Sequence, residues 1–219
     1  MPTRLRKVAR LILCTALAVT APTGVAAPGF SARQQFEKFL ADLTTLNAAF
    51  EQRVYDEKGA LLETSSGTVA IARPGKFAWI YTKPYAQSII SDGHTLWLYD
   101  KELAQVTVNA VAASAAGSAA QLLGEKVNID QQYTVKALGE QVGHAWFKLT
   151  PKQAGQQYTA IEIEMTREVI STMKLADNLG QTTELKFADL ARNKTISDAT
   201  FNFQPPVGVD VVTGTSLSK

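Results

Sequence analysis

Few residues in this sequence have the types and spacings that catalysis requires. His94 and His144 are the only histidines among the 219 residues, and each stands beside a predicted turn. The sequence has no His/Cys cluster with metal-ligand spacing, no Gly-x-Ser-x-Gly elbow and no phosphate-binding loop. Glu162 and Glu164 share one face of a predicted strand, as a general acid and base could, but they face the same way as other charged residues. We therefore interpret that face as solvated and predict no catalytic residue, no metal and no cofactor.

Arg73 is the charged residue with the most informative position. Val69, Ile71 and Arg73 alternate along a predicted strand, so they point to the same side, which the two β-branched residues mark as the inner side. A buried charge without partners is very costly, and no acidic residue lies within three positions of Arg73. The sequence therefore predicts that backbone carbonyls or a distant segment receive the guanidinium. The alternative is a strand-end arginine whose head reaches water.

The elements that position Arg73 form an antiparallel hairpin. Pro74 ends the first strand, because it has no N–H for the ladder, and Gly75 lets the chain turn back. Alternation of period two recurs through most of the chain and indicates about ten antiparallel strands in meander order. The predicted strands are 46–55, 60–72, 76–81, 86–91, 95–99, 105–108, 133–138, 145–150, 158–166, 170–176 and 181–190.

The first 26 residues are predicted to be a secretory signal peptide. Four basic residues precede a short apolar run at 11–19, and residues 24–26 form a workable cleavage site. Removing this segment takes away four basic and no acidic residues, so the formal net charge changes from +2 to −2 and leaves no basic patch for nucleic acid. The single cysteine, Cys14, is removed as well. The exported domain, 27–212, must therefore be stabilised by its core, and 213–219 are predicted to form a flexible tail.

Two segments are available to cover the apolar face of the predicted sheet. Residues 31–43 have apolar residues at helical spacing, and Ser31 can cap that helix. Residues 110–124 are rich in Ala, Ser and Gly, so they indicate one or two short, thinly packed helices or a mobile loop. A large curved sheet under such a thin cover favours an apolar hollow. A fully packed core without a hollow remains the alternative.

Three groups of residues resemble the LolA family, the periplasmic outer-membrane lipoprotein carriers of Gram-negative bacteria. The first is Arg73-Pro74 with Phe77 and Trp79. The others are Ser-Asp-Gly-His-Thr-Leu-Trp at 91–97 and Phe-Asn-Phe-Gln-Pro-Pro-Val-Gly at 201–208. Each group is short, but their order and spacing together are specific, and the similarity extends from about residue 36 to residue 211.

The resemblance implies a mainly β fold, an incomplete antiparallel β-barrel with a short helical lid over an apolar cavity. It implies that Arg73 is the lid latch, bonded to backbone carbonyls, and that Phe77 lies near the cavity mouth, where partners make contact. One departure is the segment 110–124, which has fewer large apolar residues than the family's lid. The residues expected to line the acyl-chain cavity are Phe50, Val69, Ile71, Phe77, Trp79, Phe147, Ile161, Ile163, Met173, Leu175, Leu185 and Phe187.

The function implied by the resemblance is that of a monomeric periplasmic chaperone without enzymatic activity. Its cargo is an acylated lipoprotein, received from an inner-membrane lipoprotein-releasing ABC transporter and passed to an outer-membrane receptor lipoprotein. Three other functions remain open. They are a carrier of free phospholipid or glycolipid, an exported hydrolase that uses Glu162 and Glu164, and a packed interaction module without a cavity.

Overall fold

The computed structural model describes residues 32–111, 119–141, 143–166 and 169–214. The predicted signal peptide and the middle of the Ala/Ser/Gly segment lie outside these residues. The helical elements are α1 (Ala32–Asp42), α3 (Ala119–Gly124), α4 (Ile129–Gln132) and the 3-10 helix η1 (Asp198–Phe201). The strands are β1 (Thr45–Tyr55), β2 (Leu61–Ala72), β3 (Lys76–Lys83), β4 (Gln87–Asp92), β5 (Thr95–Asp100), β6 (Gln105–Ala110), β7 (Tyr133–Gln141), β8 (His144–Pro151), β9 (Tyr158–Thr166), β10 (Val169–Asp177), β11 (Thr182–Arg192) and β12 (Asp210–Thr213).

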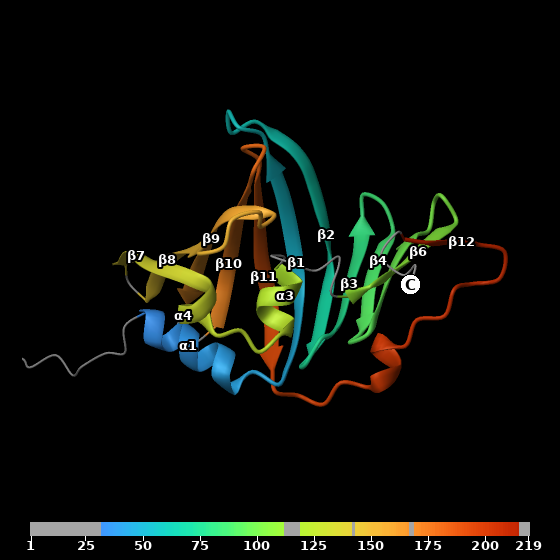
Figure 1. Cartoon of the computed structure of the whole chain (residues 1–219), viewed down its shortest axis with the longest axis horizontal. Coiled ribbons are helices and arrows are strands. Elements are labelled where there is room, and N and C mark those ends of the chain that lie inside the picture. Colours follow the sequence, from blue (N-terminus) through green and yellow to red (C-terminus); the bar gives the residue numbers. More distant parts are fainter. Residues whose placement is uncertain (1–31, 112–118, 142, 167–168, 215–219) are drawn as a thin grey trace, which may run out of the picture.

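The strands form one open, curved sheet. In the described residues the strand order is β12-β6-β5-β4-β3-β2-β1-β11-β10-β9-β8-β7. All neighbours are antiparallel except β12 and β6, which are parallel. The pairing of β1 with β11 joins an N-terminal meander to a C-terminal one, and the sheet curves around the side that carries α1 and α3 (Figure 1). The predicted fold class, an incomplete antiparallel barrel with a short helical cover, is confirmed.

Two glycines allow the β2–β3 hairpin to form. A Cβ atom at Gly67 would lie only 1.8 Å from the carbonyl oxygen of Ile80, so this close approach of the two strands excludes any other residue. Gly75 follows Pro74 at the turn and has a φ of +72°, in the left-handed region that favours glycine. The turn of the hairpin therefore lies just after Arg73, where the ends of β2 and β3 meet the helices.

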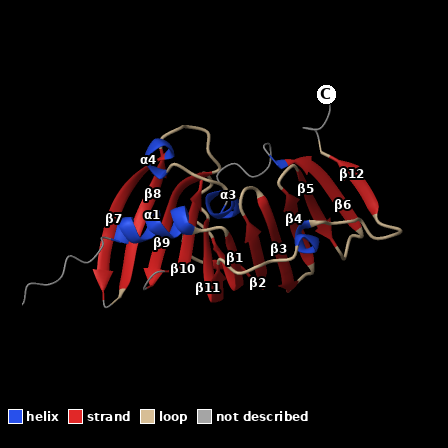
Figure 2. Ribbon diagram, turned by 90° about the horizontal axis from the view of Figure 1, so that it is seen from below, coloured by secondary structure: helices blue, strands red, loops and turns tan. Residues whose placement is uncertain are grey.

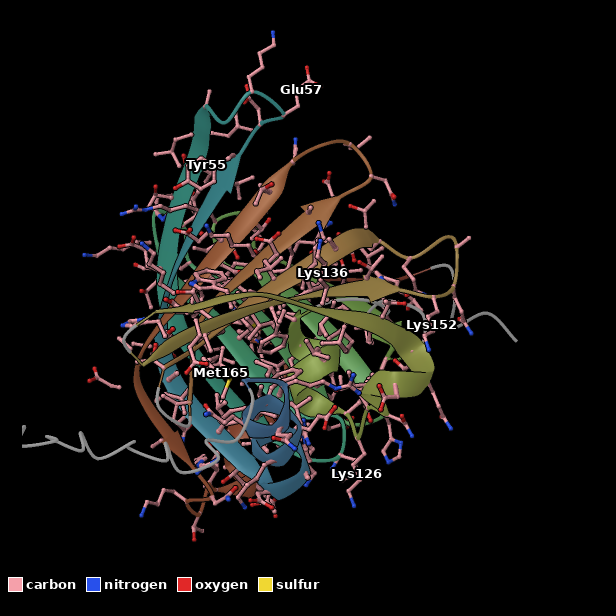
Figure 3. The ribbon with its side chains drawn as sticks, turned by 90° about the vertical axis from the view of Figure 1, so that its left-hand side faces the viewer. Tyr55, Glu57, Lys126, Lys136, Lys152 and Met165 are labelled. Carbon is pink, nitrogen blue, oxygen red and sulfur yellow. The ribbon has the colours of Figure 1, made fainter. Side chains whose placement is uncertain are left out.

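The helix α1 covers the inner face of β7–β10 (Figure 2). Its residues Phe36, Phe39 and Leu40, and Leu43 just after the helix, are all at least 95 % buried, as the helical spacing predicted. The ring centroid of Phe36 lies 4.7 Å from that of Phe147. Figure 3 shows the same separation of surface from interior, because Lys126 and Lys152 project outward whereas Met165 lies inside, near α1. This part of the inner face is a packed core.

The C-terminal segment covers part of the outer face. Phe201 in η1 is 2 % exposed and packs with Ala78 and Ile90, and Phe203 packs against Trp97 and Tyr99. The sequence analysis missed β12 and its parallel pairing with β6. The segment with Pro205 and Pro206 indicated a loop, and no sequence pattern showed that the chain after it returns to the edge of the sheet. Thr213, assigned from the sequence to the tail, is the last residue of β12, and 215–219 lie outside the described residues.

Candidate functional site

Arg73 joins the end of β2 to both helices that cover the sheet, which we call the lid (α1 and α3). Its Nε donates to the carbonyl oxygen of Leu123 at 2.7 Å, and its Nη2 lies 3.5 Å from that of Leu122. Its Nη1 donates to the carbonyl oxygen of Leu40. Leu40 lies in the last turn of α1, and Leu122 and Leu123 lie in the last turn of α3. One guanidinium therefore donates hydrogen bonds to the carboxyl ends of two helices.

This arrangement has a clear electrostatic basis. The last carbonyl groups of a helix lack partners within the helix and carry a partial negative charge. A cation that donates to them satisfies the carbonyls and its own N–H groups together. Burial lowers the pKa of Arg73, and the nearby Glu125 carboxylate acts in the opposite direction. Because the ordinary pKa of arginine is so high, the guanidinium stays charged and needs these acceptors whenever water is excluded.

Two backbone hydrogen bonds beside the Arg73 side chain also join the hairpin turn to the ends of α1 and α3. The N–H of Arg73 donates to the carbonyl oxygen of Thr44, two residues after α1, at 2.9 Å. The N–H of Gly75 donates to the carbonyl oxygen of Gly124, at the end of α3, at 3.1 Å. These two amides are only two residues apart, so the hairpin turn contacts both parts of the lid.

A cavity of about 290 Å³ lies beneath α3, on the inner face of the sheet. Four of the predicted cavity residues line it, namely Phe77, Trp79, Leu175 and Leu185. The residues that the sequence analysis missed are Gln52, Tyr81, Ile89, Leu96, Leu98, Asn109, Ala119, Ala120, Gln157, Tyr158 and Thr183. Alternation along the predicted strands already placed Tyr81 on the same face as Phe77 and Trp79, so that signal was present in the sequence.

The other eight predicted cavity residues do not line this cavity among the described residues. Phe147, Ile161, Ile163 and Met173 are at most 1 % exposed and belong to the core that α1 covers. Phe50, Val69 and Ile71 are buried in the same cluster, and Phe187 packs at its margin. Alternation identifies inner-face residues correctly, but it does not tell which of them a helix covers. Whether all twelve bind acyl chains stays a prediction.

Phe77 is buried in this structure. Its side chain is 4 % exposed and lies on the wall of the cavity, between β2 and β4. A contact between Phe77 and a partner protein therefore requires that the lid moves first.

The carboxylates Glu162 and Glu164 point to the outer face, away from the cavity. Glu162 lies 3.9 Å from Lys148, as a solvated strand face predicts. Glu164 is less exposed, at 15 %, and accepts hydrogen bonds from Ser171 and Thr172, while His144 Nδ1 lies 2.9 Å from its Oε1. Burial alone would raise the pKa of Glu164, but these three partners outweigh it and lower the pKa.

The interpretation of two residues therefore changes. His144 is the first residue of β8 and is paired across the sheet, rather than a loop residue, and Glu164 is part of a hydrogen-bonded network, rather than freely solvated. Within the described residues no group of three or more His, Cys, Asp or Glu side chains could hold a metal ion. The same residues contain no helix with the length and apolar character needed to cross a membrane.

Fold and site together define a class of protein: a single curved antiparallel sheet with short helices over its apolar inner face and a ligand-sized hollow beneath one of them. The family model described as "Outer membrane lipoprotein carrier protein LolA" matches residues 41–204. An outer-membrane lipoprotein carrier protein of Chromobacterium violaceum is 42% identical over 203 residues, which cover 92% of this chain and 97% of that protein. The chain belongs to the LolA family.

A further relative agrees with this assignment. The outer-membrane lipoprotein carrier protein of Neisseria meningitidis is 37% identical over 188 residues, which cover 86% of this chain and 90% of that protein. Among solved structures, an uncharacterized conserved protein from Thermus thermophilus has a TM-score of 0.55 at 14% identity, and the match covers 84% of this chain and 99% of that one. At this level of identity, the structural likeness shows a shared fold and nothing about function.

Proposed function

We propose that this protein is a periplasmic carrier of acylated lipoproteins. The observation that carries the proposal is the cavity beneath a lid that Arg73 closes. An acyl chain gains about 0.8 kcal/mol for each methylene that leaves water, so an apolar cavity on a soluble protein can shield such chains during transfer. The names of the relatives, outer-membrane lipoprotein carrier proteins, support this cargo.

The lid must open to accept such a cargo. A methylene group takes up space on the order of the 30 Å³ that a water molecule occupies in the liquid. The cavity of about 290 Å³ therefore holds roughly ten such groups, which is less than one long acyl chain. In this proposal cargo occupies an open state, and the arrangement in which Arg73 is bonded to three carbonyls is the closed state.

Arg73 makes the closed state distinct, because its partners come from two helices. When α3 moves away, the guanidinium loses the carbonyls of Leu122 and Leu123 but keeps that of Leu40. The closed state is thereby favoured whenever no cargo is present, and cargo is released more readily. A carrier without a nucleotide site needs such a moderate affinity, because full burial of several acyl chains would be nearly irreversible.

The proposed partners are an inner-membrane lipoprotein-releasing ABC transporter, which supplies the cargo, and an outer-membrane receptor lipoprotein, which accepts it. The protein acts as a monomer, and the role includes no catalytic step. Phe77 meets a partner at the cavity mouth once the lid has opened.

The proposal is tested by release and transfer of a radiolabelled lipoprotein. The purified protein should release the lipoprotein from spheroplasts and deliver it to outer membranes. Arg73→Leu should still take up cargo but should transfer it at least tenfold more slowly, because the closed state has lost its latch. Arg53→Leu is the matched control, since Arg53 is an exposed arginine on the opposite face of β1. Transfer by the Arg73 variant at the wild-type rate would show that the latch is wrong, and no release by the wild-type protein would contradict the carrier function.

A further inference from the structure

The inner face of the N-terminal half of the sheet changes from apolar to polar in one direction. On β3 the inward side chains are, in order, Phe77, Trp79, Tyr81 and Lys83. The hydrogen-bonded register extends this change across the neighbouring strands. One row of facing residues is apolar, the next is mixed and the third is polar. The apolar row is Val69, Trp79, Ile89 and Leu98. The mixed row is Phe50, Gly67, Tyr81, Gln87 and Asp100. The polar row is Gln52 and Ser65.

A second hollow continues the cavity in the polar direction. It has a volume of about 460 Å³ and shares Gln52 and Tyr81 with the apolar cavity. Its other walls carry charged residues, among them Glu63, Lys83 and Asp100. The two hollows thus meet at the Gln52–Tyr81 pair, in which the Tyr81 hydroxyl donates to Gln52 Oε1 at 3.0 Å. We call this meeting point the junction.

Two buried polar atoms lack partners, one from a residue in the wall of each hollow. Trp79 Nε1 and Ser65 Oγ have no hydrogen-bond partner among the described residues, although Trp79 is 5 % and Ser65 is 3 % exposed. A buried indole N–H or hydroxyl group ordinarily finds an acceptor, because leaving it unpaired is costly. Trp79 lines the apolar cavity, and Ser65 lines the polar hollow. The indole N–H can only donate and the hydroxyl group can donate as well, so an acceptor would satisfy both groups.

We propose that Trp79 and Ser65, together with the Gln52–Tyr81 pair, form a subsite for the carbonyl oxygens of acyl groups. Every acyl chain ends in an ester or amide carbonyl, which accepts hydrogen bonds, at the point where the chain meets the polar part of its carrier molecule. With that carbonyl at the junction, the hydrocarbon extends towards Phe77 beneath α3. The polypeptide leaves through the polar hollow. This inference rests on the proposed function, and it adds a preferred orientation and linkage chemistry for the cargo.

The subsite predicts a preference that an apolar cavity alone does not have. Two radiolabelled probes are compared, a cysteine peptide whose glyceryl group carries two palmitoyl esters and the same peptide with two hexadecyl ethers. The chains are of equal length and the peptides are identical, so the two probes differ only in the ester carbonyl oxygens at the heads of the chains. The full-length mature protein should bind the ester probe about tenfold more tightly than the ether probe, since each hydrogen bond to a buried donor adds to affinity.

Matched variants assign the preference to its residues. Trp79→Phe removes the N–H but keeps an aromatic ring, and it should reduce the ester preference to threefold or less. Ser65→Ala should reduce it by about threefold. Trp97→Phe, on the outer face, and Ser66→Ala, at the next position of β2, are the controls and should keep the tenfold preference. Binding of the ether probe also reports whether each variant is folded.

The outcomes separate the subsite from the carrier function. Equal affinity of the wild-type protein for both probes would overturn the subsite while leaving an acyl-binding cavity. Loss of both probes in equal proportion by Trp79→Phe would do the same, because it would show a packing role only. No binding of either probe would overturn the proposed function and the subsite with it.

Discussion

The two halves of the inner sheet face are covered in different ways. Over β7–β10, α1 and the residue just after it contribute Phe36, Phe39, Leu40 and Leu43 to a core whose largest side chains are almost completely buried. Over β2 and β3, α3 contributes only Leu122 and Leu123 as large apolar residues, and a cavity of about 290 Å³ remains beneath it. The inner face of the same sheet thus forms a packed core over one half and a cavity over the other half.

This difference indicates which part of the lid opens. Each fully buried Leu or Phe side chain contributes about 1.5–3 kcal/mol relative to its exposed form. Moving α1 would expose three such side chains, and four if the adjoining Leu43 moves with it, whereas moving α3 would expose two, so the cost for α3 is smaller. Acyl chains that enter beneath α3 offset that smaller cost. We therefore expect α1 to remain in place while α3 moves.

The largest expected effect is on the packed side. Phe36→Ala should lower the free energy of unfolding by about 3–5 kcal/mol, because it leaves a cavity against Phe147 that the sheet cannot fill. Chemical denaturation of the mature protein measures this change. A loss below about 1 kcal/mol would mean that α1 is not a fixed part of the core.

A smaller loss is expected for the same kind of change in α3. Leu122→Ala should cost about 2 kcal/mol, at the lower end for buried leucine, because α3 is only six residues long and can shift to fill part of the space that is left. It should also slow the release of cargo, since the closed state is weakened. If Leu122→Ala is as costly as Phe36→Ala, the contrast between the two halves is not energetic.

The ion pair between Arg33 of α1 and Asp130 of α4 should contribute less. Both side chains are more than 40 % exposed, and Arg33 also pairs with Glu37. Asp130→Asn should therefore cost less than about 1 kcal/mol, and added salt should remove the difference. Asp198→Asn, which breaks the pair between Lys76 and Asp198 of η1 and involves neither α1 nor α4, is the control in the same denaturation assay.

The smallest effect concerns pH and the outer face. Because the pKa of Glu164 is lowered in the folded protein, its charged form stabilises the fold. That contribution is complete above the unfolded value near 4.5 and is lost as the pH falls through the lower folded value. Wild type and Glu164→Gln should thus differ in stability at pH 6 and converge in acid. Cargo transfer by the variant at pH 7 should be unchanged, and a loss of transfer would contradict a purely structural role for Glu164.

Much of the sheet could be predicted from the sequence, because alternation is a local property. The lack of nearby acidic residues left backbone carbonyls, a distant segment or water as partners of Arg73, and the family resemblance indicated the carbonyls. The residues that supply them, Leu40, Leu122 and Leu123, could not be named. Those carbonyls come from segments 33 to 50 residues away, where sequence patterns carry no distance information. For the same reason the packed Phe147 could not be told from the cavity-lining Leu185.

The elements that the sequence analysis missed depend on long-range pairing. β12 is four residues long and pairs with β6 over a separation of about a hundred residues, so its short apolar pair gave no periodic signal. The network around Glu164 was missed because Ser171 and His144 reach it from adjacent strands. These side chains come together only through the pairing register of β8, β9 and β10, which cannot be read from the sequence.

Two amides at the hairpin turn test most directly whether α3 opens while α1 stays. The N–H of Gly75 donates to Gly124 at the end of α3, and the N–H of Arg73 donates to Thr44 beyond α1. Hydrogen exchange of both amides should be followed by NMR with and without the diacylated cysteine peptide. We predict that the peptide accelerates exchange at Gly75 at least tenfold and leaves exchange at Arg73 unchanged. Equal acceleration at both amides, or none at Gly75, would contradict a lid that opens on one side.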